Sequence, residues 1–190
     1  MTSSRAVSDI VRRLENRGNA VGPASFPRDR DEAARPGMYA WWGDAEACAV
    51  LGEEIGASLS GLLYAGQAGA TRMPSGRRSS ATLLSRVGRQ HIRGNARSST
   101  FRLTISSLLL DRLGLVSAGK GRLDAPSNGR VSAWIAEHLS VAIAPFDDRD
   151  SLSVVEGEVL QLLDPPLNLG TCLPSAARTL ITERRRLLRR

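Results

Sequence analysis

Apolar residues recur every three or four positions over residues 4–17, between arginine and aspartate residues. This period is typical of an amphipathic helix, and we expect the helix to end at Gly18. The next segment, 22–36, is rich in proline, arginine and aspartate, which indicates a connector. The chain therefore begins with a helix and a connector, over residues 1–35, before its first strand.

Two short runs of aromatic and aliphatic residues follow, and glycines bound both. They cover residues 37–42 (GMYAWW) and 61–66 (GLLYAG), and their composition is typical of strands. The residues between them, 44–56, favour a short helix. We expect the two strands to be neighbours that are separated by this helix.

A helix is predicted over residues 79–94, because serines that can cap a helix begin it and a glycine that can stop one ends it. At the α-helical period of about 100° per residue, leucine and valine side chains fall on one side. Arg86, Arg89 and Arg93 fall together on the other side and form a stripe of guanidinium groups.

The rest of the chain alternates helical and strand patterns. The expected elements are a helix over 99–113, a glycine-rich turn over 114–130, a helix over 131–139, a strand over 140–146, a helix over 151–164 that two prolines end, and a basic helix over 174–190. Strands and helices mixed in this order, without an internal repeat, predict a small α/β or α+β domain with a sheet of about three strands.

The charge of the chain is unevenly distributed. The 190 residues carry a formal net charge of +7, yet residues 55–110 contain eight arginines and no aspartate or glutamate. A second basic cluster occupies residues 178–190. Such a field favours a polyanionic partner, with nucleic acid as the first choice and an anionic membrane surface as the second.

Several classes of protein are excluded by missing motifs. Cys48 and Cys172 form no CxxC pair, only His91 and His138 are present, and neither a GxxxxGK[ST] nor a GxSxG motif occurs. No signal peptide and no apolar run of about 20 residues is visible, so we expect a soluble, cytoplasmic protein without a membrane span or a small-molecule cofactor. Its oligomeric state is left open.

Four features in fixed order carry a resemblance to a known family: PGMY, LLYAG, an arginine helix that contains a histidine, and a glutamate followed by PPLN. Over residues 36–168 the chain resembles the GIY-YIG nuclease superfamily, which includes excision-repair, homing and restriction endonucleases. Gly37-Met38-Tyr39 matches the first half of the signature, and Tyr64-Ala65-Gly66 matches the second half. The resemblance implies adjacent antiparallel strands and a metal-dependent endonuclease that acts on DNA.

The resemblance also implies a catalytic set. Phosphodiester hydrolysis needs an activated water and stabilisation of the charge that develops on the phosphoryl oxygens. Glu156, which lies 12 residues before Asn168, would hold one Mg²⁺ or Mn²⁺ ion, because Mg²⁺ commonly takes only one or two carboxylates. Arg86 would bind the phosphate. Tyr39 resembles the general base of the family, a role that requires a lowered pKa, which neighbouring arginines and a metal-bound water would favour.

The remaining site residues have supporting roles in this interpretation. Tyr64 and His91 would position water or phosphate, or would relay the proton. Asn168 would orient the local backbone, and Gly66, Arg89 and Arg93 would contact substrate phosphates together with it. Glu158 is the rival of Glu156, and only the spacing to Asn168 favours Glu156.

The chain also departs from the family pattern. Met38 and Ala65 replace isoleucine, and the 25-residue separation of the two tyrosines implies an inserted helix at about 44–57. A further insertion is expected at 103–130. The nuclease-like domain would then cover 36–170, followed by a basic C-terminal helix over 171–190 that is a DNA clamp, a membrane-surface helix or a soluble tail.

Several of the candidate residues also have a structural interpretation that involves no catalysis. Each tyrosine taken alone is more often a core residue, and His91 projects with apolar side chains, which favours a packed, hydrogen-bonded histidine. His138 is read as structural, and the arginine stripe as a solvated face that contacts DNA without chemistry. The alternative functions are an inert nucleic-acid-binding or protein-interaction module that retains the fold, and a structural subunit of a larger assembly.

Overall fold

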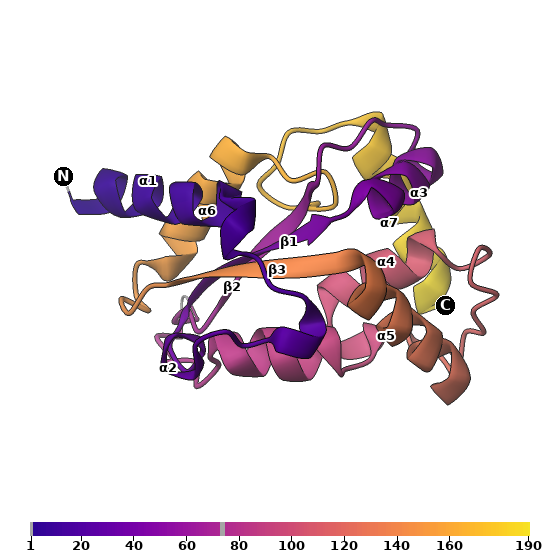
Figure 1. The fold of residues 1–190 in the computed structure, drawn as a ribbon, viewed down its shortest axis with the longest axis horizontal. Coiled ribbons are helices and arrows are strands. Elements are labelled where there is room, and N and C mark those ends of the chain that lie inside the picture. Colours follow the sequence, from indigo (N-terminus) through magenta and orange to yellow (C-terminus); the bar gives the residue numbers. More distant parts are fainter. Residues whose placement is uncertain (1, 73–74) are drawn as a thin grey trace.

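Three antiparallel strands lie at the centre of the computed structural model, which describes residues 2–72 and 75–190 (Figure 1). The central strand β1 (Gly37–Gly43) pairs with β2 (Leu62–Ala68) on one side and with β3 (Leu139–Pro145) on the other. Residue 1 of the predicted N-terminal segment lies outside the described residues. The predicted α+β fold with a small antiparallel sheet is confirmed.

The first face of the sheet is covered by α1 (Thr2–Glu15) and α6 (Leu152–Leu163). Because side chains alternate along a strand, Met38 and Ala40 of β1 point to this face. The small alanine leaves room for the apolar sides of both helices. The indole of Trp42 donates a hydrogen bond to the carbonyl of Leu14 at 3.0 Å, which ties the end of α1 to β1.

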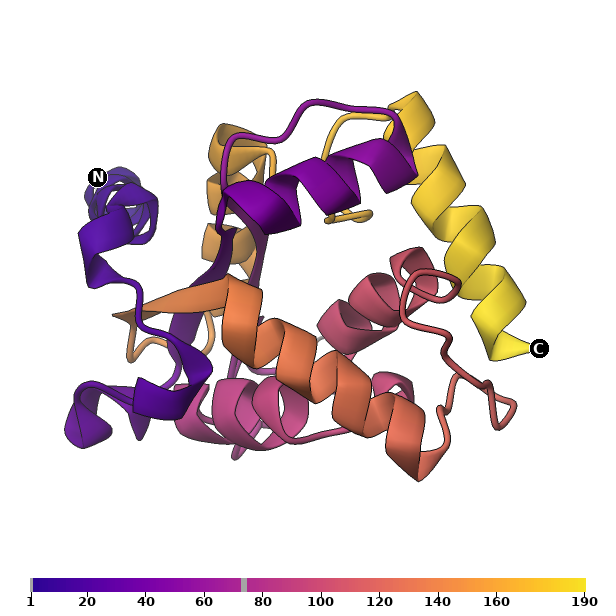
Figure 2. The same ribbon diagram turned by 45° about the vertical axis from the view of Figure 1, so that its right-hand side comes forward.

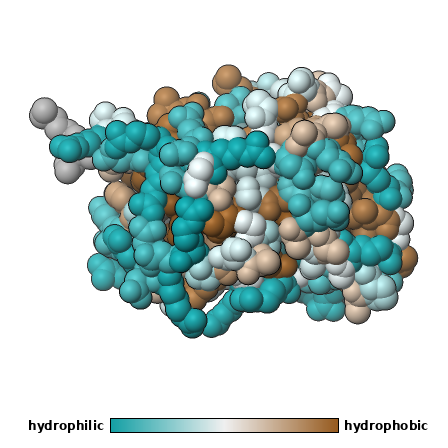
Figure 3. Space-filling model, viewed as in Figure 1, coloured by the Kyte–Doolittle hydropathy of each residue, from teal (hydrophilic) through white to brown (hydrophobic). Residues whose placement is uncertain are grey.

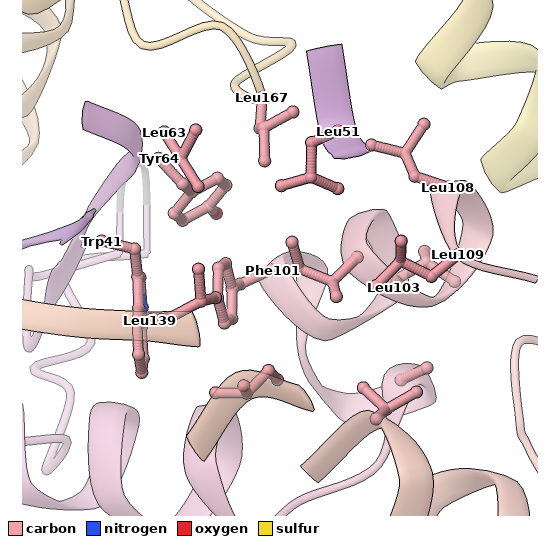
Figure 4. Packing of buried hydrophobic residues seen from close by; sticks show 14 of the residues in the cluster. Trp41, Leu51, Leu63, Tyr64, Phe101, Leu103, Leu108, Leu109, Leu139 and Leu167 are labelled. Atoms are coloured by element: carbon pink, nitrogen blue, oxygen red, sulfur yellow. The ribbon is translucent and has the colours of Figure 1, made fainter. Parts of the chain in front are cut away.

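The second face carries the larger core. It is covered by η3 (Leu84–Ile92), α3 (Ala45–Ile55), α4 (Thr100–Leu108), α5 (Ala125–His138) and α7 (Ala176–Arg189). At its centre the rings of Trp41 and Phe101 stack with centroids 4.5 Å apart (Figure 4). Figure 2 shows α7 crossing beside α3 and α4.

Short elements join these parts. They are the 3₁₀ turns η1 (Arg17–Asn19), η2 (Pro23–Ser25) and η4 (Ala96–Ser98), and the single helical turn α2 (Arg30–Ala33). Hydrophilic residues cover much of the surface seen in Figure 3, with hydrophobic residues in smaller groups between them.

Chain segments outside the sheet bond to both outer strands. On β2, the Leu167 amide donates to the Leu63 carbonyl at 3.0 Å, and the Asn168 side chain bonds both backbone groups of Ala65. On β3, Val21 and Val141 exchange backbone hydrogen bonds of 3.0 and 2.9 Å. The connector and the PPLN turn thus fasten the sheet at its two sides.

The helix predicted over 79–94 differs in start and in type. It begins near Thr82 and Ser85, whose side chains and amides exchange hydrogen bonds in the manner of a capping box, so the serines at 79 and 80 do not cap it. Its residues 84–92 form a π-helix, in which hydrogen bonds link residue i to residue i+5. The α-helical projection used for the arginines therefore does not apply here.

Two boundaries in the middle of the chain were also predicted wrongly. The helix predicted over 99–113 ends at Leu108, and the glycine-rich turn ends at Asp124 rather than at residue 130. Asp124 accepts a hydrogen bond from the Ser127 amide at 2.8 Å, and α5 therefore begins at Ala125. The end of the turn was predicted wrongly because Asp124 caps a helix there, and this cap outweighs the turn-like composition of the residues that follow it.

Candidate active site

A hydrogen-bonded chain of three side chains lies beneath the second face of the sheet. The Tyr39 hydroxyl is 2.8 Å from His91 Nε2, and His91 Nδ1 is 2.7 Å from Ser99 Oγ. Ser99 is the N-cap residue of α4, and its oxygen accepts a hydrogen bond from the Arg102 amide at 3.1 Å. The Ser99 hydroxyl can still donate to Nδ1 or accept from it, so the donor and acceptor roles along this chain depend on the tautomer of His91.

The π-helix η3 supplies the arginine nearest to this chain. Arg86 is half-buried, and its Nη1 donates to Gln90 Oε1 at 2.6 Å. Its charge opposes the rise that burial causes in the pKa of Tyr39, and adds to the fall that burial causes in the pKa of His91. The guanidinium group of Arg86 therefore belongs to the electrostatic environment of the buried pair.

Arg89 and Arg93 are exposed, unlike Arg86. The Arg93 guanidinium turns back over Gly88, where it would lie 3.4 Å from an added Cβ. The predicted stripe of three arginines is not formed, because the π-helical period separates Arg86 from the other two. Contact of Arg89 and Arg93 with substrate phosphates stays a prediction.

Tyr64 and Glu156 reach the same region from β2 and α6. The rings of Tyr39 and Tyr64 are roughly parallel, with centroids 6.5 Å apart. Tyr64 and the half-buried Glu156 line one surface pocket of about 380 Å³ together with Asn168 and Arg185. Glu158 is exposed and does not line this pocket.

Gly66 and Asn168 hold the backbone around the tyrosines. A Cβ on Gly66 would lie 2.7 Å from the Tyr39 hydroxyl, so only glycine lets this phenol pack against β2. The Asn168 side chain accepts from the Ala65 amide at 2.9 Å and donates to the Ala65 carbonyl at 2.8 Å. The structure gives both residues a positioning role, and their contact with phosphate stays a prediction.

Burial dominates the protonation of the two phenols. It raises the pKa of Tyr39 well above its usual value; Tyr64 and Glu156 raise it further, and Arg86 opposes the shift. It also raises the pKa of Tyr64 to about 12, with Glu156 adding to the rise. Among the protein groups, desolvation outweighs the nearby arginine, so they raise the Tyr39 pKa and do not supply the lowering that the base role requires.

The pKa values of His91 and Glu156 are also shifted in the direction that favours the neutral form of each group. Burial lowers the pKa of His91 to about 3, and the charges of Arg86 and Arg102 add to this effect. Burial raises the pKa of Glu156, while the backbone amide of Gln67 and then Arg86 oppose the rise. The imidazole is therefore neutral at physiological pH, and the carboxylate carries its charge at a cost that a cation would offset.

The donor set of the pocket fits a single divalent ion held by Glu156. Among residues 2–72 and 75–190, no three histidine, cysteine, aspartate or glutamate side chains cluster as a metal-binding group, and Glu156 forms no ion pair. The hydroxyl groups of Tyr64, Thr100 and Thr171 line the same pocket. One carboxylate is sufficient for Mg²⁺, which keeps several waters and shares substrate phosphate oxygens.

The sequence pattern missed three residues of this region. Ser99 was not singled out, although a serine before a helix is a capping signal. Arg102 was counted in the basic stretch, but it is fully buried, and its guanidinium donates to the His91 carbonyl at 3.0 Å. Arg185 was counted in the basic tail, yet it is buried and lines the pocket. Burial of an arginine within a basic run has no signature in the sequence.

The fold and the site define an α+β domain in which two neighbouring tyrosines lie on one face of a three-stranded sheet, with a histidine, an arginine and a glutamate near them. The profile of the GIY-YIG catalytic domain matches residues 37–186, and the chain belongs to this family. Membership indicates nuclease activity, with nucleic acid as the substrate. Searches of curated proteins and of solved structures found no match to the chain. None of the helices in the described part of the chain is long and apolar enough to cross a membrane.

Proposed function

We propose that the chain is a metal-dependent endonuclease that hydrolyses DNA phosphodiester bonds at the pocket of Tyr64 and Glu156. The observation that carries the proposal is the convergence of the hydrogen-bonded Tyr39–His91 pair, Tyr64 and Glu156 on one region, with Arg86 beside them. The family match over residues 37–186 supports the same assignment.

Glu156 would hold one Mg²⁺ or Mn²⁺ ion, whose charge would stabilise the negative charge that develops on the phosphoryl oxygens. Arg86 would bind the substrate phosphate with donors whose charge is not lost near neutral pH. Tyr64, which lines the pocket, would orient the scissile phosphate and the attacking water. Asn168 would keep β2 in place through its two bonds to Ala65.

Tyr39 would accept the proton of the attacking water as its phenolate. In the tautomer that carries its hydrogen on Nε2, neutral His91 would donate to the Tyr39 oxygen, and a hydrogen bond to the charged form of a group favours that form. His91 in turn is held by Ser99. This hydrogen bond would therefore offset part of the rise in the Tyr39 pKa that burial causes, and would increase the fraction of phenolate.

One observation favours the alternative, an inert nucleic-acid-binding module that retains the fold. The pKa of Tyr39 and that of Tyr64 are both raised, so phenolate is scarce at neutral pH. A protein with this site and no cleavage activity would still bind nucleic acid through its basic surface.

The test is incubation with supercoiled plasmid in the presence of Mg²⁺ or Mn²⁺, with and without a chelator, and with RNA in parallel. Glu156→Ala and Arg86→Ala are expected to lose nicking while they keep salt-sensitive DNA binding. Glu158→Ala is the matched control, because this exposed glutamate lies on the same helix and outside the pocket. Equal nicking by all variants would reject the site, and binding without cleavage by the wild type would favour the inert module.

A further inference from the structure

Three arginines are buried in the described part of the chain, and one of them differs from the others. Arg178 donates to the carbonyls of Asn168, Leu173 and Pro165 and pairs with the Asp164 carboxylate. Arg102 donates to carbonyls and side chains on two neighbouring elements. The Nη atoms of both arginines have acceptors, which explains how their charges are tolerated inside the fold, although the Nε atom of Arg102 is buried without one.

Arg185 has no such partners, although only 9% of it is exposed. Among residues 2–72 and 75–190, its guanidinium forms no ion pair and no hydrogen bond, and its Nε atom is fully buried without an acceptor. A buried charge that has neither a counter-charge nor a hydrogen-bond acceptor is costly, and an anionic ligand would supply both.

The position of Arg185 indicates what that ligand is. The residue lines the 380 Å³ pocket that contains Tyr64 and Glu156, and its charge lowers the pKa of Tyr64. It also lines a neighbouring pocket of about 260 Å³ with Arg186 and Arg189. The two pockets share Leu169 as well, so they are adjacent, and most residues that line the second pocket belong to α7.

The second pocket has only basic charges. Its charged residues are Arg185, Arg186 and Arg189, and no carboxylate lines it. A planar guanidinium presents a fork of donors that matches two oxygens of a phosphate group. Successive phosphates of a nucleic acid strand are the anions that would occupy a series of arginines on one helix.

We propose that Arg185 binds the backbone phosphate next to the scissile one, and that the strand continues along Arg186 and Arg189 of α7. The position next to the scissile phosphate rests on the proposed nuclease function. The phosphate site itself rests only on the buried guanidinium of Arg185, which has no partner among the described residues. This site makes α7 part of the substrate-binding surface rather than a tail.

Two probes test the site without cleavage: a short fluorescein-labelled DNA duplex, titrated in chelator over a range of salt concentrations, and inorganic phosphate, whose binding is followed through the melting temperature. Arg185→Gln is expected to weaken DNA binding about tenfold and to reduce the salt slope by about one. It is also expected to abolish the stabilisation by phosphate. Arg190→Gln is the matched control, because Arg190 directly follows the same helix, is exposed and lies outside both pockets.

The melting temperature without ligand separates a binding role from a structural one. Loss of an unpartnered buried charge should leave the melting temperature of Arg185→Gln equal to that of the wild type or higher. A lower melting temperature, or wild-type affinity for DNA and phosphate, would overturn the proposal. If the wild type cleaves no substrate but Arg185→Gln still loses phosphate binding, the proposed nuclease function fails and the phosphate site stands.

Discussion

His91 is enclosed on every side by groups that keep it neutral and fixed. Tyr39 and Ser99 occupy its two ring nitrogens, and the rings of Trp41 and Phe101 lie edge-on with centroids 6.4 and 5.5 Å away. The interpretation of His91 as a packed, hydrogen-bonded histidine describes these contacts. The same contacts let it act on Tyr39, so the structural and the positioning roles are compatible.

The raised pKa of Tyr39 predicts an alkaline pH profile for cleavage. The base must be deprotonated, so the active fraction should increase about tenfold per pH unit from neutral pH to roughly pH 9. The measurement is kcat/KM for plasmid nicking at constant salt. Tyr39→Phe should lower this rate by at least about a hundredfold and flatten the profile. A plateau at neutral pH in the wild type would contradict phenolate as the base.

The lowered pKa of His91 predicts a loss of stability in acid. Between the ordinary pKa of 6.5 and the folded value of about 3, the unfolded chain binds one more proton than the folded chain. The free energy of unfolding should therefore fall as the pH decreases through this window, by on the order of 4 kcal/mol from this residue.

Urea unfolding of the wild type and of His91→Gln at several pH values measures this contribution. The wild type should lose stability more steeply toward acid than the variant does, because glutamine does not titrate. If the free energy of unfolding depended on pH equally in the two proteins, His91 would be protonated at the same pH in the folded and the unfolded chain, and the prediction would be wrong.

At the scale of elements, the end of the π-helix η3 is held by one buried side chain of α4. The Arg102 guanidinium donates to the carbonyls of His91 and Ile92, and also to Asn128 and Ser132 of α5. Burial lowers its pKa to about 10, so it stays charged at neutral pH. Cations are favourable at the carbonyl end of a helix, and this one joins three elements behind the Tyr39–His91 pair.

Arg102→Met should therefore destabilise the protein by about 3 kcal/mol, because several buried acceptors lose their donor while the volume of the side chain is largely kept. Arg97→Met is the control, since Arg97 is exposed on η4, and its effect should stay within about 0.5 kcal/mol. Urea unfolding followed by tryptophan fluorescence compares them. Equal stability of the two variants would show that the Arg102 hydrogen bonds are not needed.

At the scale of the whole molecule, less of the positive charge is free to bind an anionic partner than the sequence suggests. Of the arginines in residues 55–110, Arg102 is buried and Arg78 lies 3.6 Å from Asp150. The basic C-terminal helix α7 places Ile181 and Leu188 in the large core, and the family match extends into it. This helix is therefore part of the fold, and its basic side contributes to the surface near the pocket.

A pair of substitutions on α7 tests this packing. Ile181→Ala should lower the free energy of unfolding by about 3 kcal/mol, because Ile181 is fully buried. Leu187→Ala should change it by less than about 0.5 kcal/mol, since 58% of Leu187 is exposed. Chemical unfolding at fixed pH is the measurement. A helix that behaves as a soluble tail would show two equally small changes.

Local signals predicted the strands and most helices well. Glycines and aromatic residues locate β1 and β2, and Pro165 and Pro166 follow the end of α6 closely, because such residues act within a few positions of themselves. The π-helical form of η3 was not predictable in this way. The spacing of Leu83, Leu84 and Val87 fits an α-helical period equally well, so it does not distinguish the two forms.

The residues of the candidate site were predicted from the order of their motifs along the chain. Their contacts and their burial are seen only in the folded structure. The resemblance named Tyr39, Tyr64, Arg86, His91 and Glu156 because their motifs follow one another, and the fold brings them to one region; their catalytic roles stay predictions. The direction of the Tyr39 pKa shift depends on its burial, which neighbours distant in the sequence decide. The burial of Arg185 without a hydrogen-bond partner among the described residues likewise depends on neighbours that are distant in the sequence.

Both outer strands of the sheet have their free sides engaged. The PPLN turn occupies the outside of β2, and Val21 of the connector occupies the outside of β3. An exposed strand edge is a template on which another chain can add a strand, and such edges promote aggregation. Along these segments that template is covered, so self-association of this protein should proceed through helices and side chains rather than through a shared sheet.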